Sequence, residues 1–97
     1  MIDAEKRWQV RQRAHGCCTV CGKMRPRYGY EKGEAAHIVA KTGWTLRTYG
    51  EEAIDHVENL TWTCPGACNS AVLITFRPVP RKAHMDRIAA IIKGRIE

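Results

Sequence analysis

Two short stretches, Cys18-Thr-Val-Cys21 and Cys64-Pro-Gly-Ala-Cys68, decide how this chain folds. The first pair has the two-residue spacing that lets both thiolates meet one metal ion, and Gly22 follows where the chain must turn back tightly. The second pair has a three-residue spacing, and its Pro65 and Gly66 form a tight turn. That spacing is within the range of zinc sites. The sequence therefore predicts a structural Zn2+ site with four ligands, namely Cys18, Cys21, Cys64 and Cys68.

A fifth cysteine leaves the identity of one ligand open, because Cys17 with Cys21 would repeat the three-residue spacing of the second pair. We assign Cys18 to the metal and expect Cys17 to be a small buried residue. The alternatives are two disulfides, or buried thiols without a metal. Disulfides belong to oxidising compartments, whose proteins normally begin with an apolar signal segment, whereas residues 1–7 are mostly charged. We therefore expect a cytoplasmic protein, in which paired cysteines favour a metal.

The length of 97 residues predicts a single domain spanning residues 1–97, of a size at which a hydrophobic core alone gives limited stability. A structural zinc ion can add on the order of 10 kcal/mol of apparent folding free energy in small modules. No apolar run in the sequence is long enough to span a membrane.

The formal net charge of +6 is unevenly distributed along the chain. Residues 1–32 carry eight Lys or Arg against three acids, whereas residues 33–66 carry two against five. Basic ends suit a phosphate backbone, which predicts DNA as the partner. Ordinary solvated helix faces are the alternative explanation. The candidate DNA-facing residues are Lys6, Arg7, Arg11, Arg13, Lys23, Arg25, Arg27, Arg77, Arg81 and Lys82.

Local patterns predict a mixture of helices and strands. Asp3 is a suitable N-cap for a first helix, and the final helix carries its apolar residues at Met85, Ile88, Ala89, Ile92 and Ile96, on one stripe. Pro78 is expected to stop the helix that begins beside the second cysteine pair. The predicted order is a helix at 3–14, a loop at 23–33, a strand at 34–40, a long connection at 41–58 with a helical turn at 51–54, a strand at 60–63, a helix at 67–76 and a helix at 81–96.

Over residues 17–77, this order of strand, connection, strand and helix, stapled by zinc, resembles the HNH endonuclease family. The resemblance depends on an ordered set of residues: Cys18 and Cys21, then His37-Ile38-Val39, Asn59-Leu60, Cys64 and Cys68, and Asn69. It implies a small α+β fold with a ββα-metal core, to which the first and last helices are flanking additions.

The resemblance also implies a metal-dependent DNA endonuclease that hydrolyses phosphodiester bonds and so nicks DNA. His37 matches the general base that takes a proton from the attacking water, a role that suits imidazole near neutral pH. Asn59 matches the residue that ties down the connection and so orients the base. Asn69 matches a ligand of the catalytic divalent ion, which is expected to be Mg2+ or Mn2+.

Ala36 departs from the family pattern, because the residue before the base is usually a second ligand of the catalytic ion. Glu34 lies on the same face of the strand as Ala36 and is a substitute ligand if the strand bends. The alternative is a catalytically silent, zinc-stabilised module that binds nucleic acid or a protein. A third interpretation is an unrelated zinc-knuckle fold in which His37 is a core residue. A homodimer or a protein partner is compatible with each of these functions.

Overall fold

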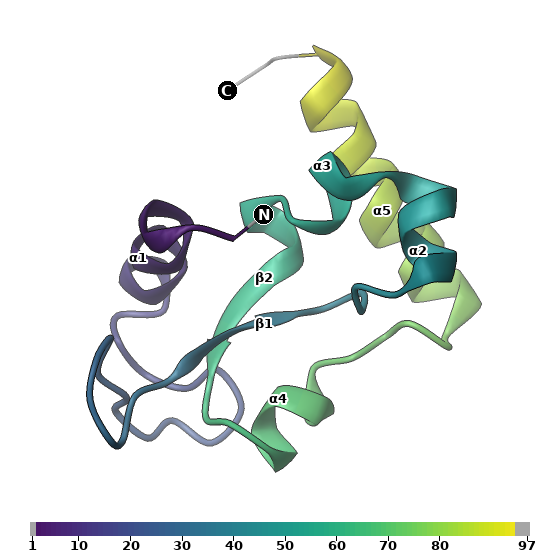
Figure 1. Cartoon of the computed structure of the whole chain (residues 1–97). Coiled ribbons are helices and arrows are strands. Elements are labelled where there is room, and N and C mark those ends of the chain that lie inside the picture. The colour runs from purple at the N-terminus through teal and green to yellow at the C-terminus, as the bar shows by residue number, and fades with distance from the viewer. Residues whose placement is uncertain (1, 95–97) are drawn as a thin grey trace.

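A two-stranded antiparallel sheet lies between the helices of the chain (Figure 1). Strand β1 (Glu34–His37) pairs with strand β2 (Leu60–Thr63), so that Glu34 lies opposite Thr63 and His37 opposite Leu60. The computed structural model describes residues 2–94. The element order is mixed, and the fold class is α+β, as predicted.

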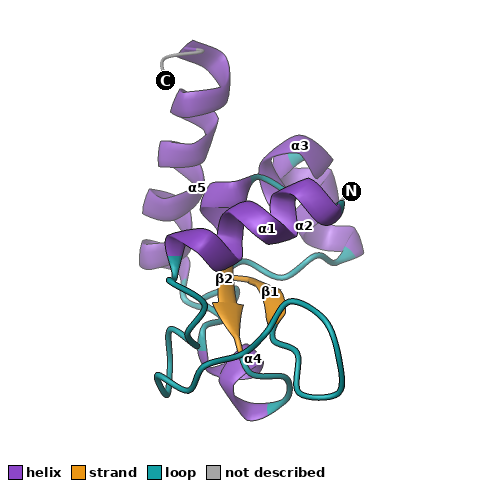
Figure 2. Cartoon of the chain, turned by 90° about the vertical axis from the view of Figure 1, so that its left-hand side faces the viewer, coloured by secondary structure: helices purple, strands orange, loops and turns teal. Residues whose placement is uncertain are grey.

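The two faces of this sheet are covered by different helices. Side chains alternate along a strand, so Trp62 and Leu60 point to one face, where they pack with Val10 of helix α1 (Ala4–Arg13). Glu34 points to the other face, where Asn69 of helix α4 (Ala67–Ala71) donates a hydrogen bond to its carboxylate. Figure 2 shows α1 and α4 on opposite sides of the strands.

A second core cluster lies beyond the sheet, where α5 (Pro78–Gly94) packs against α3 (Glu51–Ile54). Its buried residues include Ile54, Met85 and Ile88, and the side chain of Leu46, from α2 (Gly43–Tyr49), packs against them. The stripe predicted on the last helix is correct for Met85 and Ile88, but Ala89 is exposed. Ile96 is outside the described residues.

The long connection at 41–58 is more helical than predicted. The helical turn expected at 51–54 is present as α3, and a short 3-10 helix, η1 (Val57–Asn59), leads into β2. Helix α2 was not expected. It is capped by reciprocal hydrogen bonds between Thr42 and Thr45, whereas the usual sequence signature of such a capping box has Glu or Gln in the second position.

The other differences concern where elements end. Strand β1 ends at His37 and not at residue 40, and α4 ends at Ala71 and not at residue 76. Pro78 does not stop a helix but begins α5, because a proline in the first turn lacks only an N–H group that has no partner within the helix. Helix α5 consequently begins three residues before the predicted start.

Across residues 2–94, no helix combines the length and the apolar composition that crossing a membrane requires.

The packing of α5 can be tested with Ile88→Ala, because Ile88 is fully buried. The variant should lose about 2 to 5 kcal/mol of unfolding free energy, measured by urea denaturation, since truncating a buried Ile also leaves a cavity. Val79→Ala, on the same helix but at an exposed position, is the control and should change stability little. Equal losses in both variants would contradict the packing described here.

Candidate metal centre and histidine site

The four predicted cysteines lie together in one cluster. The Sγ atoms of Cys18, Cys21, Cys64 and Cys68 all lie within 4.8 Å of one another. Sulfur ligands at the usual Zn–S distance in a tetrahedral site are about 3.8 Å apart. The cluster can therefore hold a metal such as zinc, and Cys18, not Cys17, is the fourth member. Cys17 lies outside the cluster and is half-buried, where a buried position was expected.

Local backbone geometry brings the four thiols together. The amide groups of Val20 and Cys21 donate to Cys18 Sγ at 3.3 and 3.4 Å, which wraps the first turn around that sulfur. Gly22 closes this turn with a φ of 83°, and Gly66 begins α4 with a φ of 80°, both in the region that favours glycine. Cys64 follows β2 directly, and Cys68 lies in α4. The turns predicted at both glycines are therefore present.

Burial and local hydrogen bonds give two of the thiols different pKa values. Burial would raise the pKa of Cys18, but backbone N–H groups, that of Cys21 foremost, stabilise its thiolate and lower the pKa to about 6. Burial and the neighbouring Cys18 and Cys21 raise the pKa of Cys68 to about 12. Four thiolates at this spacing therefore need a cation between them, which is the chemistry that a bound Zn2+ supplies.

Arg25 adds a positive charge beside the cysteine cluster. Its Nε donates to Cys64 Sγ at 3.1 Å, and this hydrogen bond is the main reason that the pKa of Arg25 is raised. The backbone oxygen of Arg25 accepts a hydrogen bond from Trp62 Nε1, which fixes its segment against β2. Arg25 was expected on a DNA-facing surface; here it partners a candidate metal ligand, an interaction that spacing along the sequence does not reveal.

Several other residues of the predicted DNA-facing set also have partners within the chain. Arg13 donates to the backbone oxygen of Leu60 at 2.7 Å, and Arg81 to that of Thr75 at 2.7 Å. Lys82 forms an ion pair with Asp86. These residues therefore contribute to the fold as well as to the net charge.

His37 forms a pair with a buried aspartate from α3's C-terminal end. Its Nε2 lies 2.9 Å from Asp55 Oδ1, while Lys41 Nζ lies 2.8 Å from Asp55 Oδ2. The side chain of Asp55 is 1% exposed and that of His37 is 19% exposed. Burial alone would raise the pKa of Asp55, but the hydrogen bonds from Lys41 and His37 outweigh it and hold the pKa well below its ordinary value. Asp55 is therefore a carboxylate that accepts a hydrogen bond from Nε2–H of His37.

Sequence reasoning did not identify Asp55, which lies 18 residues after His37. In the sequence, Asp55 is one of several acidic residues in the long connection at 41–58, and no motif distinguishes it from the others. His56, the adjacent histidine, instead accepts a hydrogen bond from the backbone N–H of Glu58 and caps η1.

Asn59 is fully buried and uses its whole amide group. Its Oδ1 accepts from the backbone N–H of Val39 at 2.9 Å and lies 3.0 Å from His84 Nε2. Its Nδ2 donates to the carbonyls of Val39 and Ile54. The side chain thus joins Val39, two residues beyond His37, to α3 and α5. Burial lowers the pKa of His84, so that histidine is the neutral partner in this network.

Asn69 lies beside Glu34 and not beside His37. Its Nδ2 donates to Glu34 Oε2 at 2.6 Å, and Ala36, on the same face of β1, is buried. Residues 34 and 37 point to opposite faces and are about 10 Å apart along a strand. Among residues 2–94 no hydrogen bond joins the His37–Asp55 pair to the Asn69–Glu34 pair. The predicted catalytic residues His37 and Asn69 therefore lie in two separate clusters, the His37–Asp55 pair and the Asn69–Glu34 pair.

No protein-family model matches the chain, and no curated protein or solved structure matches it either.

The assignment of Cys18 as a ligand can be tested against Cys17. Native mass spectrometry should find one zinc ion per chain in Cys17→Ser, as in the unaltered protein, and none in Cys18→Ser. Because the four thiolates join distant turns, Cys18→Ser should also lose most of its helical circular dichroism, which reports the loss of the zinc contribution to folding. A folded Cys18→Ser protein with a full zinc content would contradict the assignment.

The buried Asp55 should make stability depend on pH. Since its pKa is lowered on folding, the charged carboxylate contributes stability above its unfolded pKa of about 3.9, and this contribution is lost as the pH falls towards the folded pKa. Asp55→Asn should therefore be about 3 kcal/mol less stable at pH 7, and the gap should narrow below about pH 4.

The control for this measurement is Asp86→Asn, which removes an exposed carboxylate and should change the unfolding free energy little at any pH. A pH-independent difference between Asp55→Asn and the unaltered protein would refute the ionised state of Asp55.

Proposed function

We propose that this chain is a metal-dependent DNA endonuclease of the HNH type, which nicks DNA by hydrolysing phosphodiester bonds. Its ββα-metal core would consist of β1, β2 and α4, stapled by zinc at the four cysteines. The observation that carries the proposal is the pair formed by His37 and the buried, ionised Asp55. The carboxylate of Asp55 holds His37 in one orientation, whereas a histidine that only fills a core needs no such partner.

The pair gives His37 the arrangement of a general base. Because Asp55 is a carboxylate, it fixes the proton on Nε2 and leaves the lone pair on Nδ1. Nδ1 has no hydrogen-bond partner among residues 2–94, and the side chain is partly exposed. Water at Nδ1 would lose a proton to the imidazole as its oxygen bonds to phosphorus and the bond from phosphorus to the leaving oxygen breaks.

The face of the sheet beneath α4 offers hard oxygen ligands for a divalent ion. Glu34 supplies a carboxylate and Asn69 an amide oxygen. Thr63, directly opposite Glu34, has a buried hydroxyl that lacks a hydrogen-bond partner within residues 2–94. These three groups fit Mg2+ or Mn2+, which would stabilise the charge on the scissile phosphate and leaving oxygen. Glu34 then takes the place of the ligand that Ala36 lacks.

A second candidate function is a catalytically silent module that binds nucleic acid. The separation of His37 from the Asn69–Glu34 pair favours the binding module. A base and an ion on opposite faces of β1 could reach the same phosphate only around the end of the strand. The zinc-stabilised fold and the net charge of +6 serve either function.

A plasmid-relaxation assay with Mg2+ or Mn2+ tests the proposal. His37→Asn should reduce nicking by about 100-fold or more, since general base catalysis contributes about this much, while zinc content stays the same. His15→Asn is the matched control, because His15 is exposed and has a positive φ that asparagine tolerates.

Equal nicking by the two variants would exclude His37 as the base. DNA binding without nicking in the unaltered protein, at any concentration of either ion, would favour the binding module.

A further inference from the structure

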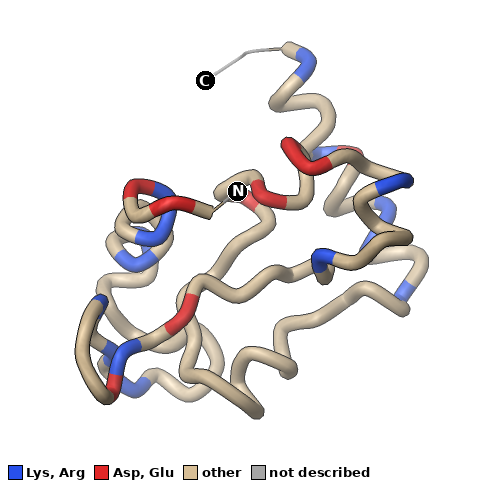
Figure 3. The backbone as a smooth tube through the Cα atoms, viewed as in Figure 1, with Lys and Arg blue, Asp and Glu red and all other residues tan. Residues whose placement is uncertain are grey.

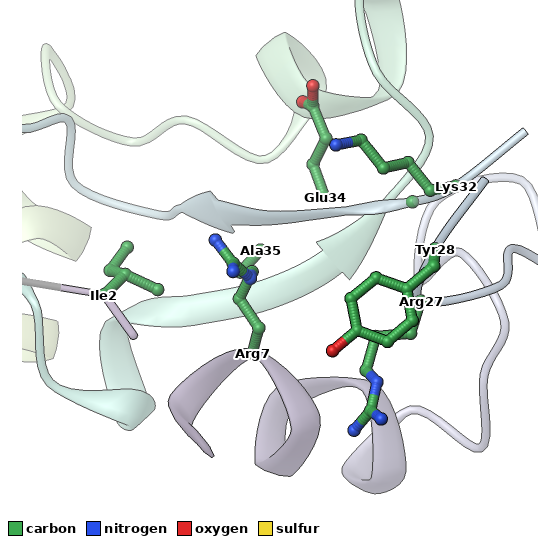
Figure 4. Close-up of a pocket in the computed structure, with 8 residues that line it drawn as sticks. Ile2, Arg7, Arg27, Tyr28, Lys32, Glu34 and Ala35 are labelled. Atoms are coloured by element: carbon green, nitrogen blue, oxygen red, sulfur yellow. The ribbon is translucent and has the colours of Figure 1, made fainter. Parts of the chain in front are cut away.

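A groove lies between α1 and β1, and it adjoins the Asn69–Glu34 pair at Glu34. Its first hollow has a volume of about 320 Å3 and is lined by Arg7 from α1 and by Arg27, Tyr28 and Lys32 from the loop before β1. A second hollow, of about 360 Å3, shares Arg27 and Tyr28 and adds Trp8. Figure 4 shows Arg7 extending from α1 towards β1, beside Ala35, with Tyr28 and Arg27 farther along. We call the two hollows together the basic groove.

The cations of the basic groove lack ion-pair partners in the part of the chain that the structure describes. Arg7, Arg27 and Lys32 form no ion pair among residues 2–94. Elsewhere, Arg13 and Arg87 share Glu58. Figure 3 shows Lys and Arg, with acidic residues among them, on α1 and on the neighbouring loop. Among the described residues, two carboxylates line the basic groove. Glu34 is turned to the far side of β1 and bonded to Asn69, and Glu5 lies in the second hollow.

Aromatic rings lie among these cations. Tyr28 is 64% exposed, and the guanidinium of Arg27 lies 4.8 Å from the centre of its ring. Trp8, in the adjoining hollow, is 43% exposed. Cations that hold phosphates, interleaved with exposed rings on which bases stack, are the combination by which proteins bind single-stranded nucleic acid. In a duplex the base faces are already stacked on one another, so Tyr28 and Trp8 would have no base to contact.

We propose that the basic groove binds a single-stranded segment of DNA, with Arg7, Arg27 and Lys32 on phosphates and Tyr28 against a base. This inference rests on the proposed function, in that the segment would belong to the strand that the enzyme cuts. The groove includes the start of β1, at Glu34, and the strand leads from there to His37. The preferred substrate would therefore contain unpaired nucleotides next to the scissile bond.

Fluorescence anisotropy with a labelled oligothymidine of about 12 nucleotides tests the groove, using zinc-loaded protein without added divalent ion. Tyr28→Ala should bind about 10-fold more weakly with an unchanged salt dependence, because stacking releases no counterions. Arg7→Ala should weaken binding and lower the slope of log affinity against log salt by about one. Lys93→Ala removes one exposed positive charge at the far end of α5 and should bind within about twofold of the unaltered protein.

A duplex of the same length should bind more weakly than the oligothymidine and should be insensitive to Tyr28→Ala. The proposal is overturned if the duplex binds as tightly as the single strand, or if Tyr28→Ala and Arg7→Ala bind as Lys93→Ala does. Because no catalytic ion is present, this result is independent of nicking. Loss of binding in the groove variants together with no nicking in any protein would reject the endonuclease and retain the groove.

Discussion

Four sulfur atoms within 4.8 Å of one another impose the constraint on which the cysteine-containing half of the structure depends. The four thiols cannot all ionise unless a cation lies between them. As neutral thiols they would take up an interior position that apolar side chains usually fill. The turn at Cys18, the end of β2 and the start of α4 all meet at this point. A metal bound here would fix the angle between the sheet and α4, and with it the place where Glu34 and Asn69 meet.

The other half of the structure depends on apolar packing. Ile54, Met85 and Ile88 form a cluster that includes no residue of the sheet and none of the cysteines. Its α3 nevertheless delivers Asp55 to His37, so the orientation of the candidate base is set by the packing of α5 against α3. The two halves of the structure therefore position different parts of the proposed site. The cysteine cluster positions the candidate ion ligands, and the apolar cluster positions the candidate base.

The features that the sequence predicted are those determined over a few residues. The spacing within each cysteine pair and the residue types of Leu60–Thr63 specify a knuckle and a strand locally. The features that it missed depend on contacts between distant segments, such as the hydrogen bond between His37 and Asp55. Pro78 shows the same limit, since a proline is compatible with the end or with the start of a helix, and only the packing of α5 decides between them. The separation of His37 from Asn69 follows from strand alternation, which the family resemblance alone did not reveal.

Asn59 has a consequence for how the sequence of this protein can change over evolution. Its amide accepts two hydrogen bonds and donates two, all within a site closed to water, so every bonding capacity of the group is used. An aspartate would lose both donors, a leucine would leave all four partners unsatisfied, and a glutamine would be one methylene too long for the space. No other residue type makes the same four hydrogen bonds, so every substitution at this position leaves at least one buried polar group without a partner.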